Sequence, residues 1–296
     1  MTVLPRIFDR QAYRARRIRA ASGGSDLILI EDTAAQAALR ISAINRRFSR
    51  GLDLHSRPYA FAALQALADS WVRTGNFSDS PSAITDDEWL PFADESFDLV
   101  TSILSLHAVN DLPGTLIQIR RLLKPDGLFM AAMFGGETLR ELRLAFAAAE
   151  ETTLGGASPR VAPFADVRDV GSLLQRAGFA LPVADVERTV IRYRDLSRLF
   201  ADLRAIGETN VLADRRKEAL SKRTLAALFQ EYESRFSDSE KRLPATFEIV
   251  FLTGWAPHES QQKPLRPGSA KARLSDALGS IEHSAGEPVP LRKPKS

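Results

Sequence analysis

The 296-residue chain contains no cysteine, which excludes disulfide bonds, thiolate metal ligands and a cysteine nucleophile. It has no apolar run near the roughly 18 residues of a membrane-spanning helix, and no secretory signal is visible. Gly-x-Ser-x-Gly elbows and Walker phosphate loops are also missing, so neither of these catalytic motifs supports a function. These absences predict a cytoplasmic protein.

Lysine is missing from residues 1–50, which hold ten arginines and four acids. Four of the arginines form a dense cluster: Arg14, Arg16, Arg17 and Arg19. Such a cluster can bind nucleic acid, anionic lipid or an acidic partner, or it can cover a solvated helix face. An arginine-rich, acid-poor start is also typical of a transit peptide. We favour the solvated face over nucleic acid, because no aromatic-basic surface or recognition motif accompanies the arginines.

Apolar runs of strand length alternate with stretches of helical periodicity. The pattern predicts strands at 51–54, 71–73, 97–106, 128–134 and 245–255. It predicts helices at 27–50, 58–69, 112–123, 137–151 and 166–177, and two more within 195–236. Gly178 is the expected C-cap of the helix at 166–177, and a turn is expected at 124–127. The alternation indicates an α/β, Rossmann-like fold, a mostly parallel sheet with helices on both faces.

Three segments are expected along the chain. Residues 1–48 form an N-terminal helical, arginine-rich segment. Residues 49–258 form the sheet domain, with a helical insertion at about 195–236. Residues 259–296 are rich in Gln, Lys, Pro, Gly and Ser, which predicts a disordered or loosely attached tail.

Polar residues follow the predicted strands where each of them ends. The first strand runs into Asp53-Leu54-His55-Ser56-Arg57, and Ser56 is the expected N-cap of a helix that begins at Pro58. In nucleotide-binding sheets this turn is rich in glycine, so that backbone N–H groups can approach the ligand. Because ligands bind beyond the carboxyl ends of such strands, the candidates there are Asp53, Asp86 and Ser105.

Residues 84–134 resemble the methyltransferase domain of the S-adenosylmethionine-dependent, Rossmann-like class (methyltransferase type 11). The resemblance rests on the runs 86–100, 105–113 and 123–127. Further segments, at 7–10, 132–139, 155–160 and 254–261, are similar to bacterial relatives of the mitochondrial complex I assembly factor. That factor is a methyltransferase-fold protein that hydroxylates an arginine of a complex I subunit. The biotin-pathway malonyl-carrier-protein methyltransferase is a more distant relative.

The resemblance implies S-adenosylmethionine as the cofactor and a protein side chain or complex I subunit as substrate or partner. It also implies a peripheral position at the inner membrane as an alternative to a cytoplasmic one. Asp86 corresponds to the acid that accepts from the adenine amino group, and the backbone of Asp87 lies beside it. The cofactor contacts that it implies are Asp53, Ser56, Asp86, Asp87 and Ser105.

The chain departs from that family at two motifs. The family's first motif, Asp-Leu-Gly-Cys-Gly, retains Asp53 and Leu54, but His55, Ser56 and Arg57 replace its last three residues. The acid that normally ends the second strand is missing from Thr74-Gly75-Asn76. Only the ten residues 76–85 precede Asp86, whereas a parallel crossover needs about a dozen or more. The third strand or its connecting helix is therefore expected to be cut back.

Three hypotheses remain open. The first is an S-adenosylmethionine-dependent methyltransferase acting on a protein. The second is a catalytically degenerate methyltransferase fold that serves as a binding or assembly factor, and the third is a nucleic-acid module. His107 follows the central strand and is a candidate base or substrate-orienting residue, although a histidine bonded to backbone is the alternative. No metal site is expected, because His55 and His107 lack the usual His-x-Asp spacing.

Overall fold

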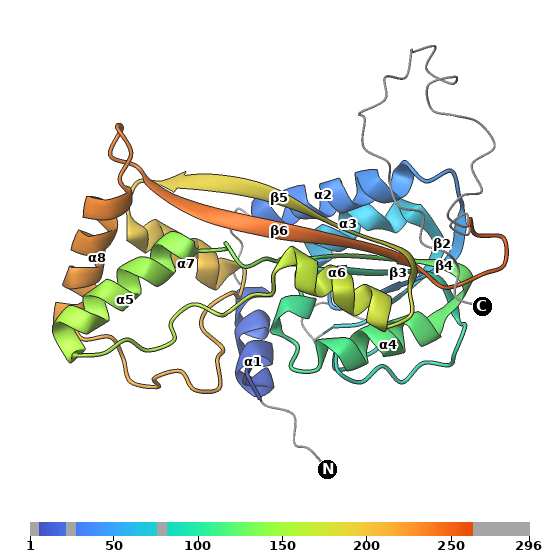
Figure 1. Ribbon diagram of the computed structural model, residues 1–296, viewed down its shortest axis with the longest axis horizontal. Coiled ribbons are helices and arrows are strands. Elements are labelled where there is room, and N and C mark those ends of the chain that lie inside the picture. Colours follow the sequence, from blue (N-terminus) through green and yellow to red (C-terminus); the bar gives the residue numbers. More distant parts are fainter. Residues whose placement is uncertain (1–5, 22–27, 76–81, 263–296) are drawn as a thin grey trace, which may run out of the picture. The chain divides into compact units, whose positions relative to one another are not determined.

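The computed structural model describes residues 6–21, 28–75 and 82–262. These residues form a six-stranded sheet in the order β2-β1-β3-β4-β6-β5 (Figure 1). Its strands are β1 (Phe48–Asp53), β2 (Ala68–Arg73), β3 (Phe97–Ile103), β4 (Leu123–Phe134), β5 (Ala180–Tyr193) and β6 (Leu243–Trp255). β6 alone runs against its neighbours β4 and β5, and the pairings among β1, β2, β3 and β4 are parallel. The predicted mostly parallel α/β sheet is confirmed.

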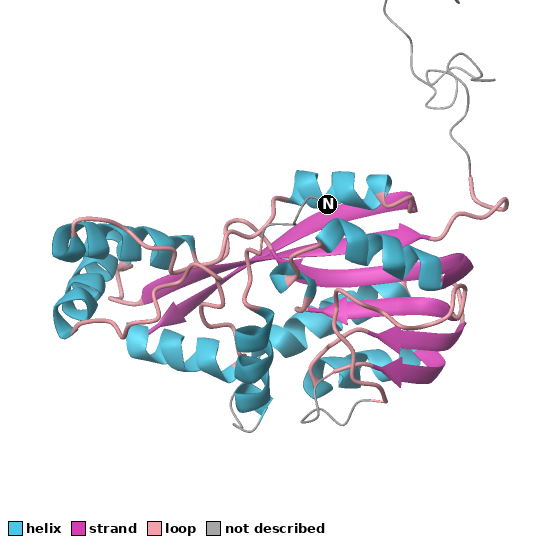
Figure 2. Cartoon of the chain, turned by 90° about the horizontal axis from the view of Figure 1, so that it is seen from below, coloured by secondary structure: helices cyan, strands magenta, loops and turns pink. Residues whose placement is uncertain are grey.

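Helices cover both faces of the sheet (Figure 2). They are α1 (Arg10–Ala21), α2 (Ile28–Ser42), α3 (Pro58–Leu64), α4 (Leu112–Leu122), α5 (Arg140–Leu154), α6 (Val167–Arg176), α7 (Leu196–Ala205) and α8 (Lys222–Phe236). One core contains α2, α3, α5, α7 and α8, and a second contains α4 and α6. In the described segments, no helix combines the length and the apolar character needed to cross a membrane.

Strand β4 contributes side chains to both cores, one on each face of the sheet. Met130, Ala132 and Phe134 belong to the first core, whereas Phe129, Ala131 and Met133 belong to the second. Successive side chains of a strand point to opposite faces, so a continuous apolar run fits a central strand covered on both faces. This is the pattern by which β3 and β4 were predicted.

The long predicted helices at 27–50 and 58–69 are wrong at their C-terminal ends. α2 ends at Ser42, and β1 begins at Phe48, whose side chain is buried in the first core. α3 ends at Leu64, and β2 begins at Ala68 after one 3-10 turn. Parallel pairing with β1 explains the second difference, since it brings the ring of Trp71 onto Gly51. A Cβ atom at Gly51 would lie 2.5 Å from that ring, so strand pairing overrides helical propensity here.

Strand β5 was not predicted, and the turn expected at 124–127 lies within β4. β5 is an edge strand whose exposed and half-buried residues alternate, so it lacks the continuous apolar run of a central strand. In β4, Leu123 pairs with Phe97 and Leu128 with Leu99, so the extra residues bulge out of the ladder. Asp126 takes a positive φ of 61° in this bulge. The predicted change of direction is therefore a local distortion of one long strand.

The crossover from β2 to β3 is as short as the sequence predicted. Residues 82–96 contain no helix, and Thr74 pairs with Ala83 only through an isolated parallel bridge. Within the described residues, β2 therefore remains the edge strand of the sheet.

The end of α5 supplies a matched test of backbone strain. Gly155 has a φ of 72°, whereas no positive φ occurs at the adjacent Gly156, and an added Cβ would meet nothing within 4 Å at either position. We expect Gly155→Ala to lower the free energy of unfolding by about 1 kcal/mol, because an L side chain is strained in the left-handed region. Gly156→Ala should change it by less than about 0.5 kcal/mol. Equal urea midpoints for the two variants would contradict a left-handed C-cap at Gly155.

Candidate functional site

Helix α1 lies against the carboxyl ends of the parallel strands and brings a buried arginine with it. Its alanine and arginine residues favour a helix, and Asp9 caps the first turn by accepting from the Ala12 N–H at 2.9 Å. Tyr13, Arg17 and Ala20 lie three to four residues apart and are buried on one face. The predicted solvated arginine face is therefore wrong for Arg17, because this face of α1 packs into the protein.

Arg17 binds the chain where the sheet ends. Its guanidinium donates hydrogen bonds to the carbonyl oxygens of Leu104 at 3.0 Å and His55 at 2.5 Å, and to the Tyr13 hydroxyl at 3.0 Å. Burial alone would lower the pKa of Arg17, but Tyr13 and two nearby carboxylates raise it. The charged guanidinium thus replaces water as the partner of carbonyl groups beyond β1 and β3.

The three residues that replace the family's Gly-Cys-Gly turn are all buried. His55 has a φ of 54°, a left-handed conformation that usually favours glycine, and its N–H donates to Thr74 Oγ1 at 3.2 Å. Its ring lies 3.2 Å from Thr85 Oγ1. Burial lowers the pKa of His55, and the attraction of Asp87 offsets that effect only in part.

Arg57 passes beneath α1 and reaches the loop that follows α7. It donates to the carbonyl oxygens of Ile206 at 2.7 Å and Arg17 at 3.3 Å. A Cβ atom at Gly207 would lie 2.5 Å from the Arg57 guanidinium, so this glycine makes room for the side chain. Arg57 therefore links the turn after β1, the helix α1 and the loop after α7.

The predicted acids at 86 and 87 also have partners within the chain. Arg10 lies 3.0 Å from Asp86 and 2.5 Å from Asp87, and Arg14 forms a further ion pair with Asp86. Arg10 also donates to the Ala108 carbonyl at 2.8 Å. Burial would raise the pKa of Asp87, but the charges of His55 and Arg10 hold it below the usual range.

The remaining predicted site residues, Asp53, Ser56 and Ser105, are buried and bond other groups of the protein. Asp53 is fully buried, accepts from Thr101 Oγ1 at 3.1 Å, and has its pKa raised to about 6 by that burial. Ser56 is not an N-cap, because its hydroxyl accepts from the Ile103 N–H at 3.0 Å; Arg57 takes the cap position without a side-chain bond. Ser105 lies 2.8 Å from the Ser102 hydroxyl.

The structure thus brings Asp53, Ser56, Asp86, Asp87 and Ser105 to one edge of the sheet. These residues do not fit S-adenosylmethionine in this conformation. Arg17 bonds the His55 carbonyl in the turn that the family keeps open with glycine, bulky His55 and Arg57 replace two glycines there, and Arg10 already bonds both acids. A cofactor that reached these groups would have to displace buried guanidinium groups from their partners.

A cavity of about 790 Å³ lies on the other side of α1, and His107 lines it. The ring nitrogen Nε2 of His107 lies 3.0 Å from the Glu208 carboxylate, and its ring packs against Phe134 and Phe164. Burial would raise the pKa of Glu208, but His107, Arg17 and Arg57 lower it. The partner of His107 is thus a carboxylate, not the backbone considered from the sequence.

Glu208 and the basic lining of this cavity were missed by sequence reasoning. Glu208 lies 101 residues from His107 along the chain, in a loop without a motif of its own. Within the described segments, no group of three or more histidine, aspartate or glutamate side chains could hold a metal ion. The carboxyl ends of the parallel strands are therefore covered by α1. Next to them lies an open cavity with one histidine–carboxylate pair.

Comparison of the sequence with known proteins identifies the family of this chain. Residues 49–131 match the family described as methyltransferase domain. The chain is 38% identical over 293 residues to arginine-hydroxylase NDUFAF5, mitochondrial, of Homo sapiens, covering 94% of this chain and 84% of that protein. The chain belongs to the NDUFAF5 family of methyltransferase-fold proteins.

Other matches are to a methyltransferase and to a structure of the same fold. Malonyl-[acyl-carrier protein] O-methyltransferase of Gallionella capsiferriformans (strain ES-2) is 40% identical over 172 residues, which is 58% of this chain and 57% of that protein. The crystal structure of the [4+2]-cyclase SpnF superposes with a TM-score of 0.52 at 14% identity, covering 87% of this chain and 99% of that chain. The first confirms the resemblance stated from the sequence, and the second supports the fold alone.

Proposed function

We propose that this NDUFAF5-family protein serves as a binding or assembly factor in which its own arginines take the place of S-adenosylmethionine. The observation that carries the proposal is the burial of Arg17 and Arg57 beside the turn after β1. Arg17, on α1, donates to the carbonyls of His55 and Leu104, and Arg57 donates to that of Ile206. Moving these buried charges would leave their carbonyl acceptors without donors, which is costly. The fold is then a rigid platform, and its partner, by the family resemblance, is a subunit of respiratory complex I.

A second candidate is an S-adenosylmethionine-dependent enzyme that acts on a protein after α1 has moved away. It is favoured by Asp53, whose Oδ2 atom is buried without a hydrogen-bond partner in the described part of the chain. Such an atom is a group that a ligand could satisfy. For this candidate, the hydrogen bonds of Arg10 to Asp87 and of Arg17 to the His55 and Leu104 carbonyls must break before the cofactor binds.

Calorimetric titration of the full chain with S-adenosylmethionine and S-adenosylhomocysteine separates the two candidates. We expect no binding tighter than about 100 μM, because the side chains at the turn already bond other groups of the protein. The double variant His55→Gly/Arg57→Gly restores the family turn and is the matched comparison. Recovery of binding in that variant would locate the obstruction at the turn.

Binding by the unmodified protein below about 100 μM would overturn the proposal. The partner is tested separately, by capture from native membranes with the full chain as bait. Enrichment of complex I subunits over a bait of the same net charge supports the proposed partner. A lack of any complex I subunit would refute that partner, whatever the outcome of the cofactor titration.

A further inference from the structure

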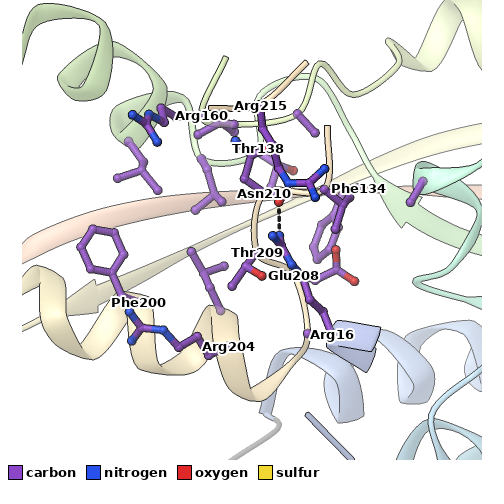
Figure 3. A pocket seen from close by; sticks show the side chains of 18 of the residues that line it. Arg16, Phe134, Thr138, Arg160, Phe200, Arg204, Glu208, Thr209, Asn210 and Arg215 are labelled. Carbon is purple, nitrogen blue, oxygen red and sulfur yellow. Dashed lines mark hydrogen bonds between the residues drawn. The ribbon is translucent and has the colours of Figure 1, made fainter. Parts of the chain in front are cut away.

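The cavity beside α1 has one extended apolar wall. Its volume of about 790 Å³ is in the range of sites that enclose a small molecule. Aromatic side chains from β4, α5, α7 and β6 supply that wall: Phe134, Phe146, Phe200 and Phe247. Figure 3 shows Phe134 and Phe200 among the side chains that line the space, well apart from each other in this view. A wall of this kind favours the apolar body of a ligand.

The rest of the lining is strongly basic. It includes seven cationic side chains, Arg16, Arg19, Arg160, Arg204, Arg215, Arg216 and Lys217. The lining contains one acid, Glu208, and that carboxylate already bonds His107. The charge facing the cavity is therefore positive, and much of it comes from residues distant in sequence.

Only part of this positive charge is neutralised by the protein. Arg160 pairs with buried Glu150 at 2.5 Å, Arg215 pairs with Asp9 at 2.9 Å, and Arg216 lies 3.7 Å from exposed Glu218. Within the described residues, no acid lies within 4.0 Å of the other four, which are Arg16, Arg19, Arg204 and Lys217. Four cations around one cavity thus lack an ion-pair partner in that part of the chain.

The position of Arg16 shows how these charges act on one another. Its guanidinium donates to the Asn210 carbonyl, which holds it at the cavity wall (Figure 3). Burial lowers the pKa of Arg16, and the like charges of Arg215 and Arg19 lower it further. A negative group placed here would remove that repulsion.

We propose that this cavity binds an organic anion with an apolar body, its negative group near Arg16 and Arg204 and its body against the phenylalanine wall. Carboxylate and phosphate oxygens match the planar donor fork of arginine, whereas a cationic side chain would face repulsion from the lining. The ligand is thus opposite in charge to the arginine that the relatives' name specifies. The proposal stands apart from the cofactor question, because the cavity does not include the turn after β1.

Three ten-carbon probes of different charge test the charge preference on the full chain: decanoate, decanol and decylammonium. Calorimetry at low ionic strength and pH 7.5 should show decanoate binding at least about tenfold tighter than decanol. A single charge-assisted hydrogen bond is enough to give this difference in affinity. Decylammonium should bind more weakly than decanol. Decanoate affinity should also fall with added salt while decanol affinity does not, a comparison that needs no variant.

The double variant Arg16→Gln/Arg204→Gln should lose about tenfold in decanoate affinity and keep its decanol affinity. Arg198→Gln is the matched control, because Arg198 lies on α7 like Arg204 but is exposed and does not line the cavity. Thermal unfolding confirms that each variant is folded. Binding of none of the probes, equal binding of decanoate and decanol, or equal losses in the double variant and in Arg198→Gln would overturn the proposal.

Discussion

Replacing Arg17 by methionine is expected to lower the free energy of unfolding by about 3–5 kcal/mol. The change removes one buried cation and leaves two carbonyl oxygens and the Tyr13 hydroxyl without their donor. Each buried acceptor that loses its partner costs about 1–3 kcal/mol. Methionine keeps the apolar inner part of the side chain but lacks the buried guanidinium end, so a loss of packing adds to this cost. Urea denaturation followed by circular dichroism measures the difference.

Arg19→Met is the control for Arg17→Met, because Arg19 lies on the same helix with an exposed side chain. It should change the free energy of unfolding by less than about 0.5 kcal/mol. A loss of less than about 1 kcal/mol in the free energy of unfolding for Arg17→Met would mean that α1 does not cover the carboxyl ends of the parallel strands in solution. The same result would remove the main support for the proposed function.

Replacing Asp53 by asparagine is expected to stabilise the protein at neutral pH. Burial raises the pKa of Asp53 to about 6, from an ordinary value of 3.8. A carboxyl whose pKa is higher in the folded state holds its proton more tightly there. Its ionisation therefore costs no stability below about pH 4, costs progressively more from pH 4 to 6, and costs a constant amount above pH 6. The difference of the two pKa values corresponds to about 3 kcal/mol.

The stability difference between Asp53→Asn and the unmodified protein should therefore grow by about 3 kcal/mol between pH 4 and pH 7.5. Urea midpoints of both proteins across this range measure it. The exposed Asp69→Asn variant controls for the change in net charge. A difference that stays constant with pH would show that the pKa of Asp53 is not raised in the folded protein.

The sequence predicted those parts of the fold that short-range patterns determine. β3 and the second half of β4 are nearly continuous apolar runs. Gly178 has the positive φ of 84° expected of a glycine at the end of α6, but the C-cap residue is Ala177, one position before the prediction. β5 was missed because only one face of an edge strand is buried, and its charged residues hid the alternation. The two helix ends were wrong because parallel pairing decides them, as the packing of Trp71 on Gly51 shows.

The candidate site could be predicted less completely, because its interactions join distant parts of the chain. The proximity of Asp53 and Ser105 follows from the pairing of β1 and β3, whereas Asp86 lies in the crossover and does not end a strand as predicted. The burial of Arg17 does not, since the carbonyl groups that hold it belong to residues 38 and 87 positions away. No local pattern marks Glu208 as the partner of His107 for the same reason.

The position of α1 also sets an order of events during synthesis of the chain. The helix is complete at Ala21, but it bonds residues that are made much later: Asn210 is 194 positions from Arg16, and Arg215 is 206 from Asp9. At about 5–20 residues per second, the ribosome takes roughly 10–40 s to supply them. Arg17 can bond the carbonyls of His55 and Leu104 earlier, but the contacts that join the start of α1 to the loop after α7 form only when this later part of the chain has been made.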